Sequence, residues 1–261
     1  PSLITVMSLK SNTRVMKISI IDDNWVPTTA LTSSYGNRTF VRYTSGVLLK
    51  SYLLVLDVDS TMIEQEVIEL LAERVGLREE VKIVTDQAMA GQINFSEALL
   101  QRVRLLEGLS SEVFIDIQSQ IQVTEGVIEL IEAIHNAGGK VGAISGGFSQ
   151  ILEPLATRLG LDCYLANELE FIDGALTGNI AGAMVDGEMK AKTLFDWANR
   201  FGIEVEDTVA VGDGANDVKM LTASGFGVAF RPKQVLREFA DLVIEGNSLR
   251  PLITELELRS S

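Results

Sequence analysis

The chain has 261 residues, 46% of them hydrophobic and 22% charged, so it is long and apolar enough to bury a core. Acidic residues outnumber basic ones by 36 to 22, giving a formal net charge of −14. This balance argues against a broad nucleic-acid-binding surface, which needs clustered Lys and Arg, and no stretch approaches the ~20 apolar residues of a membrane span.

Residues 1–50 differ from the rest of the chain. Short apolar segments at 15–21, 39–43 and 47–49 are separated by turn-rich stretches, which is typical of β-structure. So small an element cannot bury a core of its own. We therefore expect a small β-rich N-terminal element of unknown role, which packs on the main domain or on a second subunit.

From residue 51 onward, strand and helix patterns alternate, which predicts an α/β domain over 51–261 with a doubly wound parallel sheet. Strands are expected at 52–58, 141–144, 162–165, 208–211, 227–230 and 242–244, and a hairpin at 168–172 and 176–180. Helices are expected at 65–75, 79–89, 96–106, 111–121, 127–137, 149–159, 191–201 and 216–223. The helical block at about 66–124 interrupts the alternation after the first strand, so we expect an inserted cap over the carboxyl ends of the strands.

Cysteine and histidine each occur once, as Cys163 and His135. One cysteine allows no intrachain disulfide, so we expect a cytoplasmic location and a buried Cys163 on a strand. One histidine allows neither a histidine metal cluster nor a Ser-His-Asp triad. Any catalysis must therefore use carboxylates, hydroxyls and lysines.

Carboxylates follow two of the predicted strands directly. Asp57 and Asp59 come after the first strand, and Asp213 and Asp217 lie in Gly-Asp-Gly-Ala-Asn-Asp after the strand at 208–211. Burying unpaired carboxylates is costly, so pairs of them at strand ends indicate a cation such as Mg²⁺, which prefers oxygen ligands. The second motif differs from a dinucleotide-binding loop because Asp217 stands where a glycine would face the pyrophosphate.

Two further motifs fit an anion. Ser145, Gly146 and Gly147 follow a strand and precede a helix, where glycines let backbone N–H groups approach a phosphate. Lys190 and Lys192 lie near a predicted helix start, and one of them could neutralise that phosphate. Together the motifs predict a phosphoryl-transfer site.

In this order the four motifs resemble those of the haloacid dehalogenase superfamily, over about 210 residues from Tyr52 onward. Within it the chain is similar to the phosphoserine phosphatases, on the stretches 57–66, 94–103, 145–148 and 208–217. The resemblance implies a Mg²⁺-dependent hydrolase that forms an aspartyl-phosphate, with O-phospho-L-serine as its small-molecule substrate, the last step of serine biosynthesis.

The resemblance also implies roles for individual residues. Asp57 would be the nucleophile and Asp59 the acid and base; Asp57, the backbone carbonyl of Asp59 and Asp213 would hold Mg²⁺. The remaining site residues implied are Ser145, Gly146, Gly147, Lys192 and Asn216 for the phosphoryl group, Asp217 in support, Glu66 and Arg102 for the amino-acid group, and Phe95 to close the pocket.

Two other functions stay open on the sequence. The same chemistry could serve another small phosphomonoester, such as phosphothreonine, phosphohomoserine or a sugar phosphate. A phospho-accepting regulatory domain also uses an aspartate and Mg²⁺, but it needs neither a helical cap nor an acid like Asp59. We expect no nucleic-acid or membrane partner, and the sequence leaves homodimer formation open.

Overall fold

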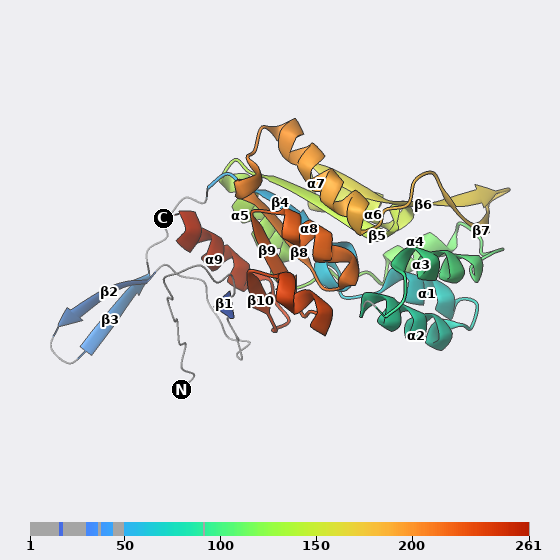
Figure 1. The fold of residues 1–261 in the computed structure, drawn as a ribbon, viewed down its shortest axis with the longest axis horizontal. Helices are drawn as coiled ribbons and strands as arrows, with labels where there is room; N and C mark the ends of the chain where they lie inside the picture. Colours follow the sequence, from blue (N-terminus) through green and yellow to red (C-terminus); the bar gives the residue numbers. More distant parts are fainter. Residues whose placement is uncertain (1–15, 18–29, 36–37, 44–49, 91, 261) are drawn as a thin grey trace.

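The computed structural model describes residues 16–17, 30–35, 38–43, 50–90 and 92–260. A central sheet in this part of the chain has the strand order β1-β10-β9-β8-β4-β5-β6-β7 (Figure 1). Its strands are β1 (Met16–Lys17), β4 (Leu53–Leu56), β5 (Lys140–Phe148), β6 (Cys163–Ile172), β7 (Ala175–Ala181), β8 (Thr208–Gly212), β9 (Phe226–Phe230) and β10 (Leu242–Ile244). All neighbours pair in parallel except β6 and β7. The predicted doubly wound parallel sheet is confirmed.

The described helices fall into two groups: some cover the two faces of this sheet, and others form a block beyond the carboxyl ends of its strands. They are α1 (Val67–Glu73), α2 (Arg78–Met89), α3 (Phe95–Arg104), α4 (Val113–Gln118), α5 (Val127–Asn136), α6 (Ser149–Leu159), α7 (Gly187–Phe201), α8 (Val218–Ala223) and α9 (Arg250–Ser260). The two-sided cover explains why β4 is apolar at every position. Leu54 and Leu56 belong to one buried hydrophobic cluster, whereas Leu53 and Val55 belong to a second, because alternate side chains of a strand face opposite sides.

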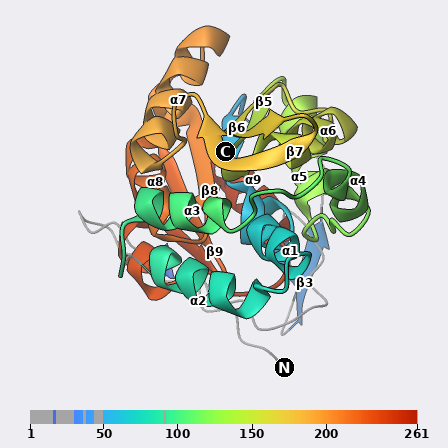
Figure 2. The ribbon, with the colours of Figure 1, turned by 90° about the vertical axis from the view of Figure 1, so that its right-hand side faces the viewer.

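Helices α1 to α4 all lie between β4 and α5 in the chain, within the stretch predicted to form a cap. The two connections to this helical block run side by side, since Ile63 forms a β-bridge with Val123 and Thr124 N donates to the carbonyl of Met62 at 3.0 Å. Figure 2 views the molecule from the side where α1 and α3 lie in front of the sheet. The division of the chain into separate domains stays a prediction.

The hairpin of β6 and β7 supports the helical block from the core side. Its turn is Asp173-Gly174, and both residues have positive φ (50° and 80°), as a tight two-residue hairpin requires. Leu176 on β7 accepts a hydrogen bond from Gly108 N and donates one to the carbonyl of Leu109, both at 2.8 Å. The sheet edge and the block are therefore joined by backbone hydrogen bonds.

Helix α7 begins one turn earlier than predicted, at Gly187 instead of residue 191. The Asp186 carboxylate accepts a hydrogen bond from Met189 N at 2.9 Å and so caps the helix. This earlier start places Lys190 inside the first turns of α7, on the face toward the sheet. Helix α9 was not predicted at all; its Leu252 and Leu256 are buried in the larger hydrophobic cluster.

Strands also occur in the described part of the N-terminal 50 residues. β2 (Ala30–Tyr35) and β3 (Arg38–Tyr43) form an antiparallel hairpin, and β1 pairs with β10. The predicted segment 47–49 lies outside the described residues. Cys163 is buried on β6, as expected, and burial raises the pKa of its thiol to about 12.

Candidate active site

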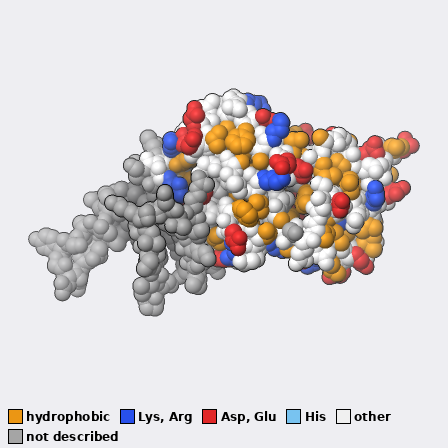
Figure 3. Space-filling model, in the orientation of Figure 1, with side chains coloured by type: hydrophobic (Ala, Val, Ile, Leu, Met, Phe, Trp, Pro, Cys, Tyr) orange, Lys and Arg blue, Asp and Glu red, His pale blue; other side chains and the backbone are white. Residues whose placement is uncertain are grey.

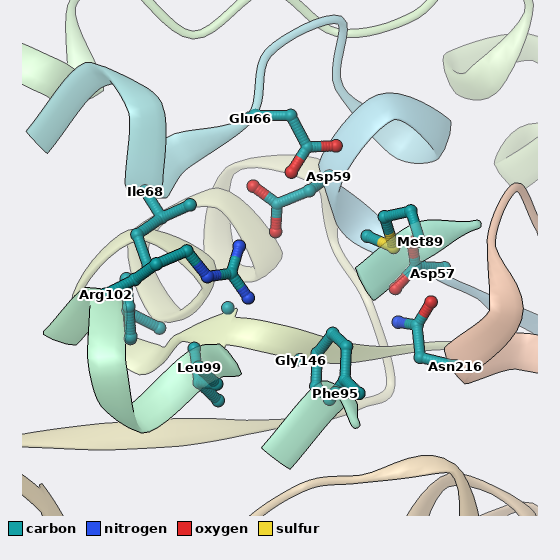
Figure 4. Close-up of a pocket in the computed structure, with 12 residues that line it drawn as sticks. Asp57, Asp59, Glu66, Ile68, Met89, Phe95, Leu99, Arg102, Gly146 and Asn216 are labelled. Carbon is teal, nitrogen blue, oxygen red and sulfur yellow. The ribbon is translucent and has the colours of Figure 1, made fainter. Parts of the chain in front are cut away.

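A pocket opens where the carboxyl ends of the central strands meet the helical block (Figure 4). Strands β8, β4 and β5 are neighbours in the sheet, so the segments that follow or end them meet at one edge. Asp57, Asp59, Gly146, Gly147 and Asn216 line the pocket from the core. Three motifs that are far apart in the sequence thus converge on one cavity.

Asp57 lies at the base of the pocket against a buried lysine. Lys190 is fully buried, and its Nζ donates to Asp57 Oδ1 and, at 2.7 Å, to Asp217 Oδ1. Burial alone would lower the pKa of Lys190, but the charges of Asp217 and Asp57 outweigh it and raise that pKa. Burial raises the pKa of Asp57 to about 7, Asp217 adds to this, and Lys190 opposes it. Lys190 is therefore the counter-ion of two buried carboxylates, those of Asp57 and Asp217.

The carboxylates of Asp57, Asp213 and Asp217 each offer an oxygen within 4.8 Å of the others. Asp57 Oδ2 and Asp213 Oδ1 are buried and have no hydrogen-bond partner in the described structure. Burial, together with Glu66 and the other carboxylates, raises the pKa of Asp213 well above its usual value. Buried, unpartnered carboxylate oxygens are costly unless a cation binds them, and hard divalent cations take oxygen ligands. The donor set fits such a cation.

Asp59 points into the pocket from a loop with an unusual backbone. The next residue, Ser60, has a left-handed φ of 56°, which is uncommon for a non-glycine residue and frequent at functional sites. Asp59 Oδ1 accepts from Val67 N at 2.7 Å, at the start of α1, and Oδ2 accepts from Ser145 Oγ at 3.2 Å. Burial raises the pKa of Asp59, and these two hydrogen bonds oppose the rise. The carboxyl group is held in place and biased toward its protonated form.

The two glycines after Ser145 are required by close approaches. A Cβ on Gly146 would lie 2.6 Å from Phe95 Cζ, and a Cβ on Gly147 would lie 2.6 Å from Asp59 Oδ2. Both glycines therefore let other site residues reach the pocket. Gly147 N donates to Ser145 Oγ at 2.7 Å, so this serine hydroxyl joins the loop to Asp59.

Lys192, which the sequence analysis chose as the phosphate-binding lysine, lies elsewhere. Its side chain is 68% exposed and its Nζ bonds to Asp196 at 2.6 Å, one turn along α7. An α-helix has 3.6 residues per turn, so two residues that are two positions apart point in different directions. Of Lys190 and Lys192, only Lys190 faces the sheet. The choice of Lys192 was wrong: Lys190 is the lysine beside Asp57.

The helical block contributes two side chains of opposite charge to the same pocket. Glu66 accepts from Ser60 Oγ at 2.6 Å, and burial, followed by the charge of Asp59, raises its pKa to about 8. Arg102 is only 3% exposed, and burial lowers its pKa. Within the described residues, neither Glu66 nor Arg102 has an ion-pair partner within 4.0 Å.

Several residues of the site were missed by sequence reasoning. Ile68, Met89 and Leu99 form apolar parts of the pocket wall, and Figure 4 shows them beside Arg102, Phe95 and Asp57. Their helical spacing is typical of any core-facing residue, so it carries no signal for a pocket. Asn167 is fully buried; its Nδ2 donates to the Gly146 carbonyl at 2.8 Å and its Oδ1 accepts from Val185 N at 2.7 Å. It joins the glycine loop to the segment before α7.

Comparisons with known proteins agree with this geometry. Residues 54–222 match the family model of the haloacid dehalogenase-like hydrolases. Phosphoserine phosphatase SerB2 of Mycobacterium tuberculosis is 48% identical over 189 residues, which are 72% of this chain and 46% of that protein. Phosphoserine phosphatase of Lactococcus lactis is 43% identical over 205 residues, covering 78% of this chain and 94% of that one.

A solved structure described as a phospho-aspartyl intermediate analogue of phosphoserine phosphatase is also similar. It superposes with a TM-score of 0.77 at 40% identity, and the match covers 79% of this chain and 99% of that one. The chain spans about half the length of the Mycobacterium tuberculosis relative and 60% of a second relative, from Archaeoglobus fulgidus.

Proposed function

Because the chain belongs to the haloacid dehalogenase-like hydrolase family, we propose that it is a phosphatase that forms an aspartyl-phosphate on Asp57. Its proposed substrate is O-phospho-L-serine, which yields L-serine and phosphate. Support for the chemistry comes from the buried cluster of Asp57, Lys190, Asp213 and Asp217 beside Asp59. The relatives named phosphoserine phosphatase support the same reaction.

In the first step, an oxygen of the Asp57 carboxylate attacks phosphorus and the bond from phosphorus to the serine oxygen breaks. Asp59 donates its proton to that oxygen, for which its raised pKa suits it. In the second step Asp59 takes a proton from water, which attacks the phosphorus of the aspartyl-phosphate and releases phosphate and Asp57. Lys190 carries positive charge against Asp57 and offsets the charge of the arriving phosphoryl group.

We propose that Asp57 and Asp213, with Asp217 beside them, hold a divalent cation, and that this cation is Mg²⁺. When bound, it would offset negative charge on the carboxylates and on the phosphoryl oxygens. The unpartnered oxygens Asp57 Oδ2 and Asp213 Oδ1 support the site. The predicted contribution of the Asp59 carbonyl stays a proposal, as do the phosphoryl contacts of Ser145, Gly146, Gly147 and Asn216.

The observation that carries the substrate is an acidic and a basic side chain on the pocket wall, neither of which has an ion-pair partner within the described residues. Glu66 suits an ammonium group, because burial and then the charge of Asp59 raise its pKa, and a bound cation would offset both effects. Arg102 suits a carboxylate, because its guanidinium is buried and forms no ion pair within 4.0 Å in the described structure. A phosphorylated amino acid carries both groups, whereas a sugar phosphate carries neither.

The test is phosphate release from O-phospho-L-serine by protein that has been depleted of metal with a chelator, measured with and without added Mg²⁺. We expect turnover only with the cation, and a kcat/KM at least ~10-fold above that for O-phosphoethanolamine, which lacks the carboxylate. Asp57→Asn is the control, because an amide of the same shape cannot attack phosphorus. Stable retention of one phosphate per chain without turnover would instead favour the phospho-accepting regulatory domain, and a preference for phosphothreonine, phosphohomoserine or a sugar phosphate would change the substrate.

Location and partners are proposed on the basis of the sequence. No helix in the described residues combines the length and apolar character needed to cross a bilayer. On the face that Figure 3 displays, acidic and basic side chains are interspersed and no basic patch stands out, in line with a small-molecule substrate and no nucleic acid. A cytoplasmic location, the absence of a membrane partner and a homodimer stay proposals.

A further inference from the structure

Thr85 on α2 is a buried polar residue that no motif includes. It is 2% exposed and does not line the pocket. Its hydroxyl donates to the carbonyl of Val81 at 2.9 Å, one turn earlier in the helix. A hydroxyl has one proton, so Thr85 Oγ1 must accept the hydrogen bond that joins it to Arg102 Nη1, at 2.6 Å. The Val81 contact thus orients Thr85 to receive the guanidinium.

Arg102 is tied at two points of its guanidinium plane. Nε donates to the carbonyl of Ala98 at 3.0 Å, within α3, and Nη1 donates to Thr85 on the neighbouring helix. An arginine has five N–H donors, so three remain, on Nη1 and Nη2. Within the described residues none of the three has a recorded hydrogen bond. Figure 4 shows the guanidinium end extended into the cavity, so these donors face the pocket.

We propose that Thr85 is a positioning residue that sets the specificity of the pocket for a substrate carboxylate, by fixing the plane of the Arg102 guanidinium. The inference rests on the proposed function. Because two of its N–H groups are held by hydrogen bonds, the plane of the Arg102 guanidinium has a fixed orientation. Its remaining N–H groups can then bind a carboxylate without a further loss of side-chain conformational entropy. The hydrogen bond to Ala98 lies within α3 and by itself would let the guanidinium rotate. The hydrogen bond to Thr85 on α2 prevents this rotation.

The experiment compares Thr85→Val with Thr85→Ser on two substrates. Valine has nearly the same shape but no acceptor, whereas serine keeps the hydroxyl. We measure kcat/KM for O-phospho-L-serine and for O-phosphoethanolamine, and their ratio for each protein. For Thr85→Val the ratio should fall about 10-fold, mostly through a higher KM for phosphoserine, and Thr85→Ser should keep the ratio within about 3-fold of wild type.

A double-mutant cycle separates positioning from general damage. In an Arg102→Ala background, Thr85→Val should leave the substrate ratio unchanged, because the group that it positions is gone. If Thr85→Val does not fold, Thr85→Ala serves in its place. An unchanged ratio in the valine variant, or an equal loss in the serine variant, overturns the proposal. If the wild-type protein does not itself prefer phosphoserine over phosphoethanolamine, the proposed function fails, and the role of Thr85 fails with it.

Discussion

Lys190 and Lys192 offer a matched pair for testing the site, because they are two residues apart on one helix. Lys190→Met removes a fully buried ammonium that pairs with Asp57 and Asp217. Removing one partner of a buried ion pair costs about 3–5 kcal/mol, since the remaining charge loses its counter-ion. Lys192→Met removes an exposed ion pair with Asp196, which lies one helical turn further along α7. Such a pair contributes about 0.3–0.5 kcal/mol to the stability of a protein.

Two measurements follow for each variant. Urea unfolding at pH 7 should give a midpoint well below wild type for Lys190→Met and nearly unchanged for Lys192→Met. The loss in Lys190→Met should shrink on addition of Mg²⁺, because a cation bound by the carboxylates replaces part of the missing positive charge. Hydrolysis of phosphoserine should fall by about 10²-fold or more in Lys190→Met, the size of effect seen when one group that offsets transition-state charge is removed.

The reverse pattern would contradict this role of Lys190. If Lys192→Met lost activity while Lys190→Met kept it, the buried lysine would be structural and the exposed one functional. If Lys190→Met matched wild type in both stability and activity, the buried carboxylates would not depend on this ammonium.

Three more predictions concern other parts of the molecule. Asp59→Asn should lower kcat/KM by about 10²–10⁴-fold, and a good leaving group such as p-nitrophenol should rescue the first step only, as single-turnover kinetics would reveal. Asn167→Leu should cost at least about 2 kcal/mol in urea unfolding, because it leaves a buried carbonyl and a buried N–H unpaired. Burial by itself would raise the pKa of Asp162, but the hydrogen bonds from Lys140 and the Val141 N–H outweigh it and lower that pKa. The charged Asp162 therefore stabilises the fold fully above the pKa of an unfolded aspartate, about 4, and this stabilisation is lost as the pH falls below that value. Asp162→Asn should therefore flatten the acid side of the stability curve, which thermal unfolding between about pH 2 and pH 6 would measure, and an unchanged slope would contradict the assignment.

The sheet and the chemistry at its edge could be predicted from the amino-acid sequence. Apolar runs such as the one that became β4 predict buried parallel strands, because both faces of such strands are covered. Asp57, Asp59 and Asp213 could be found because carboxylates directly after apolar strands are rare unless a cation or a reaction needs them. The glycines after Ser145 could be found for a different reason, because glycines between a strand and a helix let backbone N–H groups approach an anion. The structure adds a second reason, since a Cβ at either position would meet Phe95 or Asp59.

The lysine that lies in the site, and the residues that position the site, could be identified only from the packing of the folded chain. Lys190 and Lys192 are equivalent in composition and nearly so in position, and the choice depends on where the Asp186 cap starts α7 and hence on which face meets the sheet. Asn167 and Thr85 act through contacts with residues 17 to 21 positions away, and local periodicity carries no information about such contacts. Pairing between elements, not residue type, gives these side chains their roles.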